Sequence, residues 1–202
     1  FDAKLFVLDT STPSIYNDVA FGEKLKQIYP KSKIVLVGTH PSATPIETLE
    51  ISESIDIVAR HEFDYIVLEL AKAIENNSVF SNIKGITYRE NGEIKQTIDA
   101  EHIENLDDIP MAAPFIKKYL DVKDYVFPAA SYPAIQIFTG RGCPAHCNYC
   151  VYPQTLHGHK YRLRTPEHVV EEFKYIAENF PEVHEIVIED DTFTANKKRV
   201  LE

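Results

Sequence analysis

The sequence predicts an α/β protein in two parts, each built from βαβ units around a parallel sheet. In the first half, short apolar runs alternate with helical patterns, which is typical of βαβ units. The same alternation returns near the C-terminus, after an acidic stretch that is interrupted by prolines. We therefore expect a first domain at residues 1–98, a connection at 99–133 and a second domain at 134–202.

The strands of the first domain are expected at short apolar runs, residues 5–8, 34–37, 55–59 and 85–89. The last run is followed by Asn91-Gly92 and by another run at 93–97. Because Asn-Gly favours the two-residue turns that join antiparallel strands, these two runs predict a hairpin.

Three helices are expected between these strands. The first covers about 18–29. The second begins at Thr44-Pro45-Ile46-Glu47, a sequence that resembles a capping box with proline at the first helical position, and this helix ends before Asp56. Asp64 can cap the third helix, which continues to about Glu75. The stripes expected to be buried are Phe21, Leu25 and Ile28 in the first helix, and Val67, Leu70, Ala71 and Ile74 in the third.

The second domain is expected to begin with a strand at 134–138 that leads into a Gly-Arg-Gly and cysteine loop. A helix then starts at Thr165-Pro166-Glu167 and is stopped by Pro181. Its expected buried side comprises Val169, Phe173, Ile176, Ala177 and Phe180. A strand at 185–188 follows, and parallel α/β folds bind ligands at the carboxyl ends of such strands.

Composition excludes several classes of protein. The 21 Lys+Arg against 31 Asp+Glu give a net charge of −10, so a surface that tracks nucleic-acid phosphates is not expected. No apolar run reaches the ~18 residues of a membrane span, and the N-terminus lacks a signal-peptide pattern. We expect a cytoplasmic protein without a membrane partner. The chain starts at Phe1 and its single methionine is Met111, so we expect a processed product or a cut piece of a longer chain.

The three cysteines, Cys143, Cys147 and Cys150, lie within eight residues in a C-x-x-x-C-x-x-C pattern. An odd number of clustered cysteines indicates a metal site rather than a disulfide framework. Thiolates on one loop suit an iron–sulfur cluster or zinc. With a four-iron cluster, one iron would lack a protein thiolate and could accept a small molecule. The alternative is a structural zinc site of the Cys3His type, completed by one of the neighbouring histidines, His146, His157 or His159.

The cysteine loop resembles that of the radical S-adenosylmethionine (SAM) superfamily, which reads C-x-x-x-C-x-aromatic-C after the first barrel strand. Tyr149 is the aromatic residue. The resemblance implies that the cysteines ligate a 4Fe-4S cluster whose open iron chelates SAM. Reductive cleavage of SAM then gives a 5′-deoxyadenosyl radical, which abstracts hydrogen from a small organic substrate. The second domain would be the start of a partial TIM barrel, and the electron donor would be a protein such as a flavodoxin or ferredoxin.

Further residues are implied to contact SAM. Asp190 and Asp191 follow the 185–188 strand, where the superfamily usually has Gly-Gly-Glu, and subfamilies with Asp-Asp-x-Phe look similar. These carboxylates could instead be ordinary helix N-caps. Arg164, in a Tyr-Arg-Leu-Arg-Thr-Pro stretch that also contains Arg162 and resembles the same subfamilies, could pair with the SAM carboxylate or form a surface salt bridge. Together with Tyr149, these residues form the predicted SAM set.

The first domain resembles the Rossmann-like, cobalamin-binding domain that precedes many radical SAM cores. Thr10, Ser11 and Thr12 follow its first strand, and Gly38 and His40 follow its second, where hydroxyl groups and a close backbone approach suit a polar ligand. The resemblance assigns these five residues to cobalamin. His40 could instead stabilise the loop by hydrogen bonding, and the whole domain could be a Rossmann-like module without a cofactor.

The chain also departs from that family. Only one glycine precedes the x-His-Pro stretch, and His61-Glu62-Phe63-Asp64 stands where a Gly-Glu-Gly-Glu type of segment is frequent. No Asp-x-His-x-x-Gly motif, whose histidine replaces the lower cobalt ligand, occurs. Bound cobalamin would imply methyl transfer, although some relatives use the same parts for other radical chemistry. The alternative function is a non-catalytic iron–sulfur module for binding or electron transfer; RNA modification is disfavoured by the acidic balance.

Overall fold

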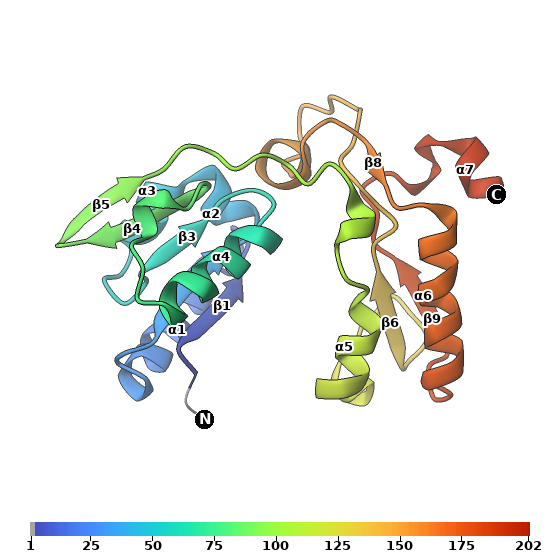
Figure 1. Ribbon diagram of the computed structural model, residues 1–202, viewed down its shortest axis with the longest axis horizontal. Helices are drawn as coiled ribbons and strands as arrows, with labels where there is room; N and C mark the ends of the chain where they lie inside the picture. The colour runs from blue at the N-terminus through green and yellow to red at the C-terminus, as the bar shows by residue number, and fades with distance from the viewer. Residues whose placement is uncertain (1–2) are drawn as a thin grey trace. The chain divides into compact units, whose positions relative to one another are not determined.

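The computed structural model describes residues 3–202, which form two compact units (Figure 1). The first unit combines the chain up to His102 with the segment His146–Gly158, and the second combines Ile103–Ala145 with His159–Glu202. No helix among the described residues has both the length and the apolar character that crossing a membrane requires. The α/β class predicted from the sequence is confirmed.

The first unit contains a five-stranded sheet in the order β1-β2-β3-β4-β5. Its strands are β1 (Leu5–Asp9), β2 (Lys33–Val37), β3 (Ile57–Ala59), β4 (Ile86–Glu90) and β5 (Glu93–Gln96). The first three strands are parallel, as expected, whereas β4 pairs antiparallel with both of its neighbours. The predicted hairpin is confirmed, because Asn91 and Gly92 have φ values of 54° and 85° and such a pair of positive φ values builds a type I′ turn.

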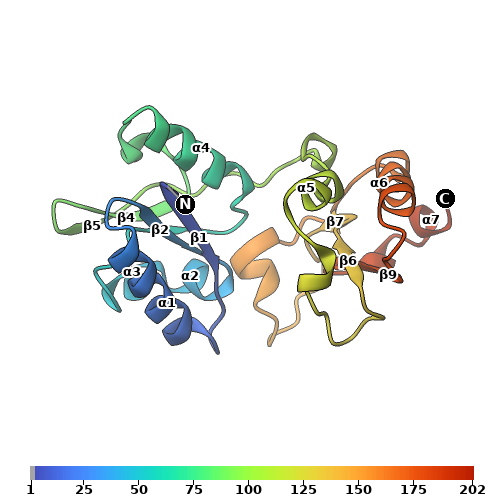
Figure 2. The same cartoon turned by 90° about the horizontal axis from the view of Figure 1, so that it is seen from below.

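Helices cover both faces of this sheet (Figure 2). They are α1 (Ile15–Ile28), α2 (Thr39–Ala43), α3 (Pro45–Glu50) and α4 (Asp64–Glu75), with a 3-10 turn at Phe80–Asn82. Val35 and Val37 of β2 belong to the core on the α4 side, while Ile34 and Leu36 belong to the core with α1 and α3. This alternation along one fully buried strand is why β2 reads as a continuous apolar run.

The predicted burial of α1 was only partly right, because Leu25 packs against the core as expected but the other two predicted positions do not. The helix begins at Ile15 and buries Ile15, Val19 and Gly22, whereas Phe21 and Ile28 are exposed. The reason is Gly22, because a Cβ there would lie 2.7 Å from Ile55 Cδ1. The helix packs on the core through Gly22, a residue that a search for apolar side chains does not select.

Two predicted helix caps were also wrong. Thr44 Oγ1 donates to the His40 carbonyl at 3.2 Å and does not cap α3, although Pro45 stands at its first position as expected. In α4, Asp64 is the first helical residue and Phe63 occupies the cap position without a side-chain bond. The buried residues of α4 are Ile66, Leu70 and Ala73, while Ala71, which we expected inside, is exposed.

The second unit has a parallel pair of strands, β6 (Ala134–Ile137) and β9 (Glu185–Ile188), joined through α6 (Pro166–Asn179). The predicted cap of α6 is confirmed, since Thr165 Oγ1 accepts from the His168 amide at 3.3 Å. The remaining elements of the second unit are β7 (Gly140–Arg141), β8 (Arg162–Leu163), α5 (Ala112–Tyr119), α7 (Lys197–Leu201) and 3-10 turns at Leu106–Asp108, Val122–Asp124 and Phe193–Ala195. A one-turn π-helix at Pro153–His157 belongs to the first unit.

The stretch expected to be a connection carries structure of the second unit. Ala113 of α5 and Val122 lie in one core with Ile135, Ile137 and Ile176. The predicted buried side of α6 needs a correction, because Ala177 is exposed and the charged residue Glu172 is only 1% exposed. The boundaries of the two domains stay predictions.

Glu172 is buried because three donors satisfy its carboxylate. Oε1 accepts from the amides of Ala112 and Ala113 at 3.0 and 3.2 Å, at the beginning of α5, and Oε2 accepts from Arg164 Nη1 at 2.6 Å. A carboxylate suits the free amides of a helix N-terminus. One side chain of α6 therefore holds α5 in place.

A second polar contact fixes the start of α6. Asp107 Oδ1 accepts from the Thr165 amide at 3.0 Å and lies 2.9 Å from His168 Nδ1. Burial alone would raise the pKa of Asp107, but these hydrogen bonds and the charge of His168 outweigh it, and the pKa is lowered.

Candidate functional site

The carboxyl ends of β1 and β2 form a small polar cavity of about 170 Å³ in the first unit. Its lining residues are Asp9, Thr10, Ser11, Ser14, Thr39, Tyr152 and Leu156. The sequence predicts a ligand site at this edge, and Thr10 and Ser11 are among the predicted residues. The side chains of Tyr152 and Leu156 were not foreseen, because nothing in their spacing links them to the first domain.

Hydroxyl groups dominate one wall of this cavity. Thr10 is buried and donates to the Asp18 carboxylate, and Ser11 Oγ lies 3.2 Å from Ser14 Oγ. Partial burial raises the pKa of Asp9, with a further contribution from the Asp18 carboxylate. The wall thus offers both hydrogen-bond donors and acceptors.

Gly38 and His40 lie at the same edge and organise its loops. Gly38 has a φ of 105°, and a Cβ there would lie 2.3 Å from Asp9 Oδ1, so only glycine fits. His40 Nδ1 lies 3.1 Å from Thr12 Oγ1, and Nε2 lies 3.4 Å from Thr44 Oγ1. The loop-stabilising role that we considered for His40 is therefore present, and its contact with cobalamin stays a prediction.

The segment that follows the cysteines packs against this edge. His61 has a φ of 61°, and its backbone amide donates to Ser42 Oγ at 2.9 Å. Its Nδ1 lies 3.2 Å from the Thr155 carbonyl oxygen. The hydroxyl-rich wall fits the polar tail of a cobalamin. The cavity is smaller than the roughly 300–1,000 Å³ of an ordinary small-molecule site, so it has room for part of that cofactor only.

The cysteine loop begins where β6 ends. All three cysteines are free thiols, and thiols on one loop are the donor set that an iron–sulfur cluster needs. Cys143 belongs to the second unit, while Cys147 and Cys150 belong to the first, where the Cys150 amide donates to the Cys147 carbonyl at 3.2 Å. Across residues 3–202, no three Cys, His, Asp or Glu side chains lie in an arrangement that could hold a metal ion. The cluster ligands therefore stay a prediction.

The predicted SAM residues of the second unit lie around the start of this loop. Asp190 accepts hydrogen bonds from Thr139 and Gly140, and Asp191 accepts one from Gly142. The alternative that these carboxylates are ordinary helix caps is not seen, because the 3-10 turn that follows has Thr192 at its cap position, without a side-chain bond.

Arg164 forms a buried ion pair rather than the surface salt bridge that we considered. Its Nη1 lies 2.6 Å from Glu172 Oε2 and the side chain is 9% exposed. Tyr149, of the first unit, is 85% exposed. Contacts of these residues with SAM stay predictions.

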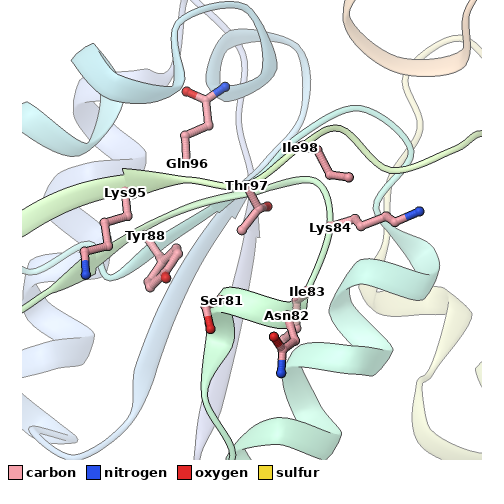
Figure 3. A pocket seen from close by; sticks show the side chains of 9 residues that line it. All are labelled: Ser81, Asn82, Ile83, Lys84, Tyr88, Lys95, Gln96, Thr97 and Ile98. Carbon is pink, nitrogen blue, oxygen red and sulfur yellow. The ribbon is translucent and has the colours of Figure 1, made fainter.

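The first unit has a second, larger cavity, of about 630 Å³, between the turn Phe80–Asn82 and the β4–β5 hairpin. Figure 3 shows Tyr88 pointing to the side of Ser81, whereas Gln96 points to the opposite face of the hairpin. None of the predicted cofactor residues lines this cavity.

Part of the chain matches a known family. The sequence profile of the radical SAM superfamily matches residues 137–202. An uncharacterized methyltransferase of Pyrococcus horikoshii is 29% identical over 202 residues, covering 100% of this chain and 42% of the relative. An anaerobic magnesium-protoporphyrin IX monomethyl ester cyclase of Cereibacter sphaeroides is 27% identical over 95% of this chain and 31% of the relative. The C-terminal third of the chain is therefore similar to the radical SAM superfamily.

The fold agrees with that similarity. The radical SAM methyltransferase TsrM from Kitasatospora setae, solved with cobalamin and a [4Fe-4S] cluster, gives a TM-score of 0.70 at 16% identity, over 97% of this chain and 39% of that one. The cobalamin-dependent SAM radical enzyme OxsB, solved with aqua-cobalamin and SAM, gives 0.67 at 19% identity, over 94% and 26%. The fold predicted from the family resemblance is confirmed. The chain spans less than half the length of these radical SAM relatives.

Proposed function

We propose that this protein is part of a radical SAM enzyme that cleaves SAM reductively at a 4Fe-4S cluster. One observation carries the proposal. The C-x-x-x-C-x-aromatic-C sequence follows β6 and the two-residue strand β7, within the region that matches the superfamily. Cys143, Cys147 and Cys150 would hold three irons and leave the fourth open to SAM.

When bound, the reduced cluster supplies the electron that breaks a sulfur–carbon bond of SAM and gives a 5′-deoxyadenosyl radical. The residues of this chain hold the loop and orient the ligand. Tyr149, next to the last thiolate, is our candidate for a contact with SAM. A flavodoxin or ferredoxin is the proposed electron donor, and a small organic molecule is the proposed substrate.

We further propose that the hydroxyl-lined edge of the first unit holds cobalamin. Thr10, Ser11 and Thr12 would bind its polar tail, and Gly38 would bring the backbone close to it. The name of the Pyrococcus horikoshii relative supports methyl transfer as the reaction class. The competing function is a non-catalytic iron–sulfur module whose first unit binds no cofactor.

The test is a cofactor inventory followed by a reaction. Protein reconstituted without oxygen should contain iron and sulfide in a cluster, and it should convert SAM to 5′-deoxyadenosine in the presence of a strong reductant. Replacing Cys143, Cys147 and Cys150 together by Ala should abolish both, whereas His146→Ala, inside the same loop, should leave both intact. Stoichiometric zinc without sulfide would contradict the proposal. An intact reduced cluster that never cleaves SAM would favour the non-catalytic module, and cobalt bound after incubation with cobalamin tests the first unit.

A further inference from the structure

The entry limb of the cysteine loop, residues 138–143, is held by side chains from several elements of the second unit. Asp190 makes the densest set of contacts. Its Oδ1 accepts from the Thr139 amide at 2.6 Å and from the Gly140 amide at 3.0 Å, and its Oδ2 accepts from Thr139 Oγ1 at 2.5 Å. Both oxygens of this carboxylate are therefore engaged by the limb.

The end of the limb nearest the first cysteine is also anchored. Gly142 has a φ of 86°, and its amide donates to Asp191 Oδ2 at 2.8 Å. The carbonyl of Cys143 itself lies 3.1 Å from His159 Nδ1. Both Gly142 and the predicted cluster ligand Cys143 thus have side-chain partners for their backbone.

Arginine side chains hold the carbonyl groups of the same limb. Arg164 Nη1 donates to the Phe138 carbonyl at 2.7 Å, and Arg199 Nη2 donates to the Thr139 carbonyl at 2.9 Å. Gly140 lies so close to β8 that a Cβ would meet Leu163 Cδ2 at 2.7 Å. The limb is fixed by charged groups on its amide side and on its carbonyl side.

From this geometry we propose that Asp190 and Asp191 are positioning residues that fix the backbone leading to Cys143, rather than direct ligands of SAM. Irregular backbone needs partners for its amide groups, and charged carboxylates are the strongest acceptors available. A site built on a preorganised backbone binds its ligand without first ordering the loop. The inference rests on the proposed function in one respect only, namely that Cys143, at the end of the limb, is a cluster ligand.

The first experiment needs no cluster. Amide hydrogen exchange over residues 138–143 is measured in metal-free protein, for the wild type, Asp190→Asn and Asp191→Asn. We expect exchange about tenfold faster in each variant, the factor that corresponds to ~1.4 kcal/mol. Glu189→Gln is the matched control, because Glu189 is the adjacent carboxylate and Oε1 accepts from Gln136 Nε2 at 3.0 Å, on an exposed pair outside the limb. Wild-type exchange rates in both aspartate variants would overturn the inference.

The second experiment separates positioning from SAM binding in the reconstituted protein. Positioning predicts that Asp190→Asn loses iron to a chelator about tenfold faster than wild type, while the SAM concentration that half-saturates the spectral change of the reduced cluster shifts less than twofold. Unchanged iron loss with a tenfold weaker SAM titration would overturn the inference. If the wild type takes up no cluster, the proposed function fails, and the exchange experiment alone then decides the positioning role. Asp191→Asn, which weakens the acceptor of the Gly142 amide, serves where the Asp190 variant unfolds.

Discussion

Glu172→Ala should be the most destabilising of the simple substitutions in the second unit. The change leaves the buried Arg164 guanidinium without its counter-ion, and removing one partner of a buried pair costs about 3–5 kcal/mol. It also removes the acceptor of the Ala112 and Ala113 amides at the start of α5, a loss similar to that of a helix cap, about 1 kcal/mol. Because the protein can relax around the site, we expect a total loss of about 4 kcal/mol in the free energy of unfolding.

The assay is urea unfolding of the second unit, followed by far-ultraviolet circular dichroism. Glu171→Ala is the matched control, because Glu171 is the neighbouring acid of α6 and is exposed; it should change stability by less than about 0.5 kcal/mol. Replacing Arg164 by Met together with Glu172 by Leu removes both charges and should be milder than Glu172→Ala. A loss below about 1 kcal/mol for Glu172→Ala, or a double variant that is no milder, would refute the reasoning.

Three further changes test the strand-end loops and the titrating carboxyls. Gly38→Ala should destabilise the first unit by more than about 2 kcal/mol in thermal unfolding, because the new Cβ would clash with Asp9 at the end of β1. The control is Gly92→Ala, which should cost only about 1 kcal/mol, because φ is also positive there but the space around a Cβ is open. Since the pKa of Asp107 is lowered in the folded protein, its ionised form adds stability above the ordinary carboxyl pKa, so Asp107→Asn should be less stable than wild type at pH ~7 and equal to it in acid. The pKa of Asp9 is raised in the folded protein, so its ionised form lowers the stability, and Asp9→Asn should be more stable than wild type at neutral pH. Urea titrations of both variants at neutral and at acidic pH should show each difference from wild type vanish once the pH is below the ordinary carboxyl pKa.

Local patterns predicted the strands and the hairpin well, because each is encoded in a few adjacent residues. The Asn91-Gly92 turn and the continuous apolar run of β2 are examples. Helix faces were predicted less well. Gly22 is buried because α1 approaches Ile55 so closely that no side chain fits between them. Glu172 is buried because donors elsewhere in the chain, Ala112 and Arg164, satisfy its charge. Neither cause is visible without the tertiary structure.

The same distinction applies to the candidate site. Placing Thr10 and Gly38 at one edge follows from the parallel order of β1 and β2, which the sequence predicts. Tyr152 lines the same cavity, although it lies more than a hundred residues after Thr10 in the chain. Sequence periodicity cannot predict a contact of this kind. The carboxylate of Asp190 was predicted at the correct strand end, but its hydrogen bonds with Thr139 depend on the register of β6 and β9.

The first unit is discontinuous in sequence, since His146–Gly158 returns to it after the chain has entered the second unit. During synthesis, its fold therefore stays incomplete until Gly158 has emerged from the ribosome, well after its sheet is finished. A fragment cut after His102 would lack the carbonyl of Thr155 near His61 and two lining residues of the strand-end cavity, Tyr152 and Leu156. Anyone who wishes to study cofactor capture by this unit in isolation should splice the later segment back in, rather than truncate at the apparent border.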